Sequence, residues 1–94
     1  MIIRPEAEAD MAEARAFYEG RSEGLGDAFL ASVEQILTSI EAMPDVHAVI
    51  HRDVRRVLIR RFPFSIYYRV EAGQIIVLAV IHSRRNPRDW KSRA

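Results

Sequence analysis

Residues 54–83 constrain the fold more than any other part of the chain, because their apolar pattern predicts three consecutive antiparallel strands. The first strand, residues 56–62, mixes apolar side chains with arginines and ends where a proline, which has no N–H, opens a turn. In the second, residues 64–71, apolar and polar side chains alternate, as in a strand with one buried face. The apolar run after a glycine-containing turn predicts a central strand, residues 75–82, that is buried on both faces.

Two helical patterns precede these strands. Residues 5–20 open with a proline and three acidic side chains, which favour a first helical turn, and Gly20 is placed to cap the helix end. Residues 24–43 carry a longer apolar stripe, and the short connection predicts an antiparallel helical hairpin. With a strand at residues 1–4, the sequence predicts an α+β fold of order β-α-α-β-β-β. We expect a small antiparallel sheet with this N-terminal helical hairpin packed on one face.

A chain of 94 residues fits a single domain over residues 1–94. It has no cysteine, which excludes disulfides and thiolate metal sites. His47 and His51 lie near two aspartates, but the segment follows a proline and does not predict a helix that would align them, so we expect no metal and no cofactor. Because there is no signal-peptide pattern and no apolar run long enough to span a bilayer, we expect a cytoplasmic protein without membrane association.

The formal net charge of +1 conceals an asymmetry between the two halves. Residues 1–50 hold three basic and ten acidic side chains, whereas residues 51–94 hold eleven basic and three acidic ones. Such a distribution indicates an anionic partner for the second half, either a nucleic acid or an acidic protein segment. Neutralisation of one half by the other is the alternative, but residues 84–93 hold five basic side chains against one acidic one.

Three segments carry a resemblance to a known family. They are the first helical segment EAEADMAEARAFYE, the start of the second, GLGDAFLASVE, and the long run VRRVLIRRFPFSIYYRVEAGQIIVLAVIHSRRNPRDW. Together they resemble the RelE/ParE superfamily of toxins from bacterial type II toxin-antitoxin systems, and most closely its ParE branch. The resemblance implies a small sheet with a packed helical hairpin, action in the cytoplasm, and neutralisation by a cognate, ParD-like antitoxin in a hetero-oligomer.

The superfamily contains two functional classes. RelE-like members cleave mRNA on the ribosome, whereas ParE-like members resemble inhibitors of DNA gyrase and are not nucleases. In the nucleases an arginine opens the tyrosine-bearing strand, a second follows the last strand, and a tyrosine or histidine lies near the C-terminus. The corresponding residues here are Ser65, which supplies no cation, Arg84 or Arg85, and Trp90, which is neither acid nor base at neutral pH. We therefore expect a gyrase inhibitor that acts by binding.

Two alternatives remain open at this point. One is a ribosome-dependent mRNA endonuclease that uses Arg60, Arg61, His82 and Arg85, since an imidazole is suited to acid-base catalysis and His82 lies beside arginines. The other is a toxin that has lost its activity.

Two surfaces are predicted. The residues expected to bind the target are Arg84, Arg85, Arg88, Trp90 and Lys91. Those expected to bind the antitoxin are Arg56, Arg60 and Arg69, as the basic rim of an apolar groove.

The apolar pattern stops at Ile81, so we expect the C-terminal tail to add little to the core and a chain truncated after Ser83 to stay folded. Trp90 either fastens the tail or contacts a partner, and a short helix after Asn86 presents the cations.

Overall fold

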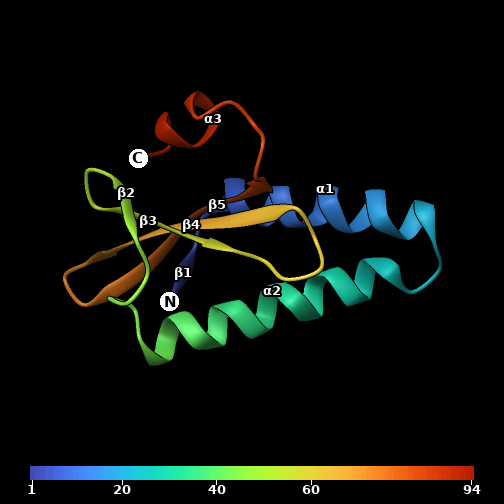
Figure 1. Ribbon diagram of the computed structural model, residues 1–94, viewed down its shortest axis with the longest axis horizontal. Helices are drawn as coiled ribbons and strands as arrows, with labels where there is room; N and C mark the ends of the chain where they lie inside the picture. Colours follow the sequence, from blue (N-terminus) through green and yellow to red (C-terminus); the bar gives the residue numbers. More distant parts are fainter.

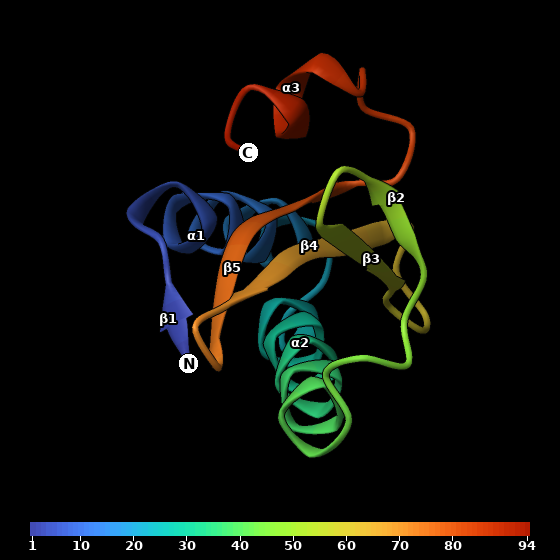
Figure 2. The same ribbon diagram turned by 90° about the vertical axis from the view of Figure 1, so that its left-hand side faces the viewer.

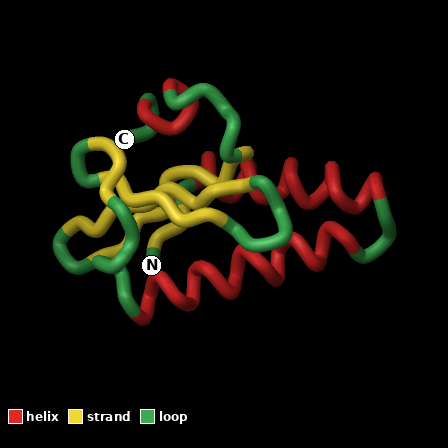
Figure 3. Tube along the Cα trace, viewed as in Figure 1, coloured by secondary structure: helices red, strands yellow, loops and turns green.

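A five-stranded sheet separates a thick helical layer from a thin C-terminal layer in the computed structural model, which describes residues 1–94 (Figure 1). Its elements are β1 (Ile2–Ile3), α1 (Pro5–Arg21), α2 (Leu25–Ala42), β2 (Val49–His51), β3 (Val54–Leu58), β4 (Phe64–Glu71), β5 (Gln74–His82) and α3 (Arg88–Lys91). The predicted α+β fold is confirmed: in the sequence both long helices follow the first strand and precede the other four. Figure 3 shows the two long helices in red beside the strands in yellow. None of the helices combines the length and the apolar character that a membrane crossing requires.

The strands lie in the order β1-β5-β4-β3-β2. β2, β3, β4 and β5 pair antiparallel with their neighbours, but β1 pairs parallel with β5. The expectation of a fully antiparallel sheet is therefore wrong at this edge, because the chain reaches β5 only after a long connection through both helices, which permits a parallel neighbour.

Two boundaries also differ from the prediction. The first long strand ends at Leu58 and not at residue 62, and Phe62 is buried within the turn that follows. The segment between α2 and β3, for which the sequence predicts no helix or strand, contains the three-residue edge strand β2.

Both long helices pack on one face of the sheet, as predicted (Figure 2). Phe29 of α2 has no exposed surface and packs in one cluster with Ile66 and Tyr68 of β4 and Val77 of β5. The alternation in β4 accounts for this arrangement, because Ile66 and Tyr68 face the helices while Tyr67 faces away. Burying a side chain such as Phe29 contributes about 2 kcal/mol through the hydrophobic effect alone.

The turn of the helical hairpin depends on two glycines. Gly24 adopts φ +86°, a left-handed conformation that favours glycine, and Gly26 lies so close to α1 that an added Cβ would be 2.7 Å from the carbonyl oxygen of Arg15. The carboxylate of Glu19 accepts the N–H groups of both glycines, at 3.0 and 2.9 Å, which satisfies donors at the start of α2. Gly20, expected to cap α1, instead lies within that helix.

Candidate functional site

The C-terminal tail, residues 83–94, lies over the sheet face opposite the long helices (Figure 2). Trp90 is only 6% exposed, and its indole stacks on Tyr67 with ring centroids 4.9 Å apart. Trp90 belongs to a second buried cluster together with Val54, Leu78, Ala79 and Ile81. The expectation that the tail adds little to the core is therefore wrong, because one large aromatic side chain fills a hollow that the apolar pattern after Ile81 does not reveal.

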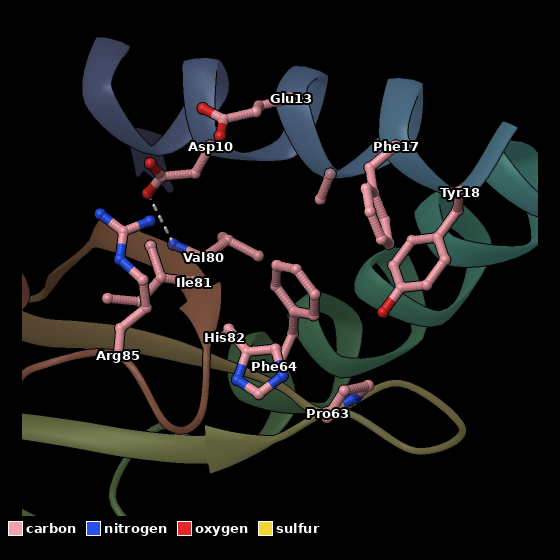
Figure 4. A pocket seen from close by; sticks show the side chains of 11 residues that line it. Asp10, Glu13, Phe17, Tyr18, Pro63, Phe64, Val80, Ile81, His82 and Arg85 are labelled. Carbon is pink, nitrogen blue, oxygen red and sulfur yellow. Dashed lines mark hydrogen bonds between the residues drawn. The ribbon is translucent and has the colours of Figure 1, made fainter. Parts of the chain in front are cut away.

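An ion pair fastens the end of the tail to the helical layer. The guanidinium of Arg93 donates to both carboxylate oxygens of Asp10 in α1, with 3.2 Å between Nη2 and Oδ1, and to the carbonyl oxygen of Leu78. Asp10 also accepts the N–H of Val80 at 3.0 Å (Figure 4). The hydrogen bond to Asp10 raises the pKa of Arg93 above its ordinary value. Since both side chains are largely buried, at 11% and 19% exposed, the pair is a structural contact and not a surface ion pair.

The docked tail carries all four predicted target-binding cations on its surface. Arg84, Arg85, Arg88 and Lys91 are all exposed. Arg85 pairs with Asp89, with 2.9 Å between Nε and Oδ2, while the other three form no ion pair within the chain. The predicted short helix forms, and the side-chain oxygen of Asn86 accepts the N–H of Arg88 at 2.9 Å. The surface is thus preorganised and carries unneutralised positive charge.

Trp90 is not an exposed anchor. Of the two roles that the sequence leaves open, the geometry provides the first, because the buried indole fastens the tail and retains almost no surface for a partner. The ammonium of Lys91 lies 5.7 Å from the centre of this ring, which links the exposed charge to the buried aromatic. Trp90 therefore positions the cations of the tail.

Arg56 and the serine that stands in the nuclease arginine position form a hydrogen-bonded chain. Arg56 Nε donates to Ser65 Oγ at 3.1 Å, and Ser65 Oγ lies 2.8 Å from Ser83 Oγ. Ser65 is fully buried, so its hydroxyl joins three strand ends and offers nothing to a substrate. This contact holds one of the three predicted antitoxin-binding arginines in place.

The other two predicted antitoxin-binding arginines lie apart. Arg69 is on the same face of the sheet as Arg56, but it bonds Glu71 at 3.2 Å and the carbonyl oxygen of Ala94 at 2.7 Å. Arg60 is exposed in the turn after β3. The three arginines therefore do not form one continuous rim, since only Arg56 and Arg69 share a face.

The residues that the nuclease alternative requires lie in two separate places in the structure. Arg61, in the β3–β4 turn, has φ +75° and lies over the ring of Phe62 at 5.4 Å. His82 Nδ1 accepts the N–H of Arg84 at 3.0 Å, so this nitrogen is already used within the chain. His82 and Arg85 line one pocket, whereas Arg60 and Arg61 are not among its lining residues.

That pocket, of about 400 Å³, lies between α1 and the ends of β4 and β5 (Figure 4). Its apolar side includes Phe64 and Val80, and its rim carries Glu13, His82 and Arg85. Tyr18 also lines the pocket, and burial raises the pKa of its phenol. The pocket can receive an apolar side chain whose polar atoms reach acidic and basic groups.

Two of its lining residues carried a weak or misleading signal in the sequence. The apolar side chain of Phe17 favours a buried position on the first helix, yet Phe17 is 54% exposed at the pocket, with the guanidinium of Arg21 at 4.7 Å from its ring. Asp10 is one of the three acidic side chains that favour the first turn of that helix. A carboxylate that must meet a strand amide 70 residues away has no local pattern.

The histidines near α2 take structural positions. His47 packs edge-on to Tyr68, and its carbonyl oxygen accepts Arg55 at 2.6 Å, while His51 packs edge-on to Trp90. No three acidic or histidine side chains lie close enough together to hold a metal ion. Tyr68 is fully buried and donates to the carbonyl oxygen of Pro44 at 2.6 Å; burial raises the pKa of its phenol.

Comparisons with known proteins agree with this architecture. The family model described as "ParE toxin of type II toxin-antitoxin system, parDE" matches residues 1–87. A solved structure described as "Chromosomal ParDE TA system from P. aeruginosa" has the same fold, with a TM-score of 0.62 and 21% identity, over 87% of this chain and 95% of that chain. No curated protein sequence matches the chain.

Proposed function

The chain belongs to the ParE toxin family of type II toxin-antitoxin systems, and from this premise we propose that it inhibits DNA gyrase by binding, in the cytoplasm, until a cognate antitoxin neutralises it. One observation carries the proposal: the docked tail presents Arg84, Arg88 and Lys91 without an internal counter-charge. Gyrase engaged on DNA is a large, strongly anionic target, which such a surface attracts.

Docking of the tail supports a binding role for these cations. A tail without contacts would lose conformational entropy when it bound a target, at a cost of about 0.5–1.5 kcal/mol for each immobilised long side chain. Trp90 and the Asp10–Arg93 ion pair already hold the backbone of the tail in place, so part of this cost is met during folding. A preorganised basic surface binds more tightly than a flexible one with the same charges.

The antitoxin is proposed to bind elsewhere. A disordered acidic segment that folds on binding needs apolar contacts as well as cations. A groove of about 360 Å³ on the helical hairpin, around Met11 and Leu30, offers such apolar contacts. Our candidates for electrostatic contacts to this partner remain Arg56, Arg60 and Arg69. Of the two on the sheet face, Arg56 makes fewer side-chain hydrogen bonds within the chain than Arg69.

The test uses purified toxin in a supercoiling assay with DNA gyrase, with accumulation of cleaved DNA as a second readout. We expect inhibition by the wild-type chain and its loss in the double variant Arg84→Ala/Arg85→Ala, with antitoxin binding retained. The matched control is Arg15→Ala/Arg21→Ala, which removes two arginines from the helical hairpin and is expected to inhibit normally. These point substitutions replace the truncation after Ser83, because truncation also removes Trp90 and Arg93 and exposes the second buried cluster.

A parallel assay follows mRNA on ribosomes. If the toxin left gyrase unaffected and cleaved ribosome-bound mRNA, with activity lost in His82→Ala, the endonuclease alternative would replace the proposal. If neither readout responded to a folded chain that binds antitoxin, the chain would be an inactive family member.

A further inference from the structure

A hollow of about 580 Å³ opens between the β2–β3 turn and α3, and we call it the basic cleft. Its walls come from segments far apart in the sequence. One wall consists of His51 and Arg52, and the other is formed by residues of the tail: Asn86, Pro87, Arg88, Lys91 and Ser92. Pro87 is the only lining residue with a hydrocarbon side chain, unlike the pocket beside α1, which has several.

The basic cleft concentrates positive charge. Arg52, Arg88 and Lys91 are exposed, none of them pairs with a carboxylate, and no acidic side chain lines the cleft. The nearest acid of the tail, Asp89, is held by Arg85. Three like charges around one hollow repel one another, and an anion between them removes that repulsion.

The backbone of the β2–β3 turn holds Arg52 in an unusual conformation. Its φ is +52°, in the left-handed region that residues other than glycine rarely occupy, and the pairing register shifts between Val49 and His51. A two-residue hairpin turn requires this conformation, which Ala72 also adopts in the β4–β5 turn, so the turn fixes the backbone of Arg52. Here the opposite wall is the docked tail, whose Trp90 ring packs edge-on to His51 at 5.7 Å.

We propose that the basic cleft binds the phosphate backbone of a nucleic acid. Guanidinium groups match phosphate oxygens in a two-pronged geometry, a lysine adds a point charge, and Asn86 and Ser92 supply neutral donors of the kind that accompany phosphate contacts. An acidic peptide is the poorer occupant, because an ordered peptide needs several apolar anchors and the cleft lining offers only Pro87. Binding through phosphates alone is independent of base sequence.

The inference extends the proposed function, since a toxin on DNA-engaged gyrase would contact the bound DNA through this cleft, but it is tested without gyrase. The full chain is titrated into a fluorescent duplex of about 20 base pairs, and anisotropy is measured at several salt concentrations between about 50 and 200 mM. The key variant is Arg52→Asn, because asparagine tolerates the left-handed conformation, so the guanidinium is removed without straining the turn. Arg21→Gln, which removes one exposed arginine at the end of α1, is the matched control.

We expect salt-dependent duplex binding by the wild-type chain. Arg52→Asn weakens it roughly fivefold and lowers the slope of log K against log salt by about one, whereas Arg21→Gln changes affinity by less than about twofold. Arg52→Lys keeps the charge but loses the two-pronged contact, so we expect it to restore the slope and only part of the affinity. Thermal unfolding of each variant verifies that the fold is intact.

Three results would overturn the inference: no duplex binding at the lowest salt concentration, equal losses in Arg52→Asn and Arg21→Gln, or Arg52-dependent binding of poly-glutamate without binding of DNA. The last would identify an acidic protein segment as the occupant. If the chain inhibited gyrase but did not bind DNA, this inference would be wrong and the proposed function would stand. If it bound DNA but did not inhibit gyrase, the proposed function would be wrong and this inference would stand.

Discussion

The two faces of the sheet are covered in different ways. Two long helices cover one face, with a cluster of thirteen buried residues beneath them. A short tail covers the other, with a cluster of six buried residues that includes Trp90. The helical layer carries most of the acidic side chains of the chain, while the tail layer carries unpaired cations.

Because of this difference, we expect the helical layer to supply most of the stability and the tail layer to supply the binding surface. The helical layer has enough buried area to stabilise the domain, so it tolerates a partner binding on its outside. The tail layer depends on one indole and one ion pair, and it is expected to open locally at a lower free energy than global unfolding. A binding surface on such a layer is ordered enough to be preorganised, and a single substitution is enough to release it.

The largest effect is expected from Phe29→Ala in the helical layer. Phe29 has no exposed surface and contacts the rings of Tyr18, Phe62 and Phe64, so its removal leaves a cavity and lowers the free energy of unfolding by about 3–5 kcal/mol. Urea denaturation measures the change, and the loss should appear equally in all regions of the chain by hydrogen exchange. If protection from exchange were lost only in the tail, the helical layer would not be the main source of stability.

Trp90→Ala should have a smaller and more local effect. The tail can undock as a unit, so we expect a loss of about 2 kcal/mol, below that of a deep core residue, with fast amide exchange confined to residues 83–94. We expect gyrase inhibition to weaken, because the tail that carries the cations is no longer fixed to the sheet. Leu58→Ala is the matched control on the same face: Leu58 is 60% exposed, and we expect a change within about 0.5 kcal/mol. Uniform loss of protection would show that the tail is part of the main cooperative unit.

Asp10→Asn tests the link between the two layers. The substitution removes the charge that faces Arg93, and because this pair is largely buried we expect a loss of about 1–2 kcal/mol together with faster exchange at the end of the tail. Asp27→Asn is the control, since the Asp27–Arg15 pair is exposed and worth about 0.5 kcal/mol or less. If both variants lost the same stability, the Asp10 pair would be no more than a surface contact.

The smallest effect is expected from Tyr68→Phe. It removes the hydrogen bond to Pro44, at about 1 kcal/mol, and sharpens the comparison by testing a polar contact within the helical layer. Burial raises the pKa of Tyr68 above its ordinary value of 10.0, so its phenol contributes stability that is fully present below that value and is lost as the pH rises through the raised one. Urea denaturation from neutral pH to about pH 11 should therefore show a shallower alkaline decline in the variant. An unchanged decline would assign it to other groups.

Much of the fold followed from local patterns. β4 spans the predicted residues 64–71, and both long helices agree with their predicted limits within one residue at each end. These elements have strong periodicity, because each presents one face to a core. The parallel edge of the sheet did not follow, since a two-residue strand such as β1 carries no signal of direction.

The candidate site was predictable only as a set of charges. Arg84, Arg85, Arg88 and Lys91 were identified from composition, because an unbalanced run of cations is visible in the sequence. Their arrangement was not predictable. The arrangement of the antitoxin candidates was not predictable either. Arg60 lies in a turn because β3 ends at Leu58, before the predicted strand end.

The sequence by itself determined the α+β class, the helical hairpin on one face and the excess of cations after β5, because these depend on the periodicity and composition of neighbouring residues. Only the tertiary structure decided that Trp90 stacks on Tyr67, that Asp10 holds Arg93, and that the β2–β3 turn and the tail enclose one cleft. Each of these contacts joins residues that are distant in the chain. Such contacts leave no periodic pattern, since they depend on how the completed sheet brings its two ends together.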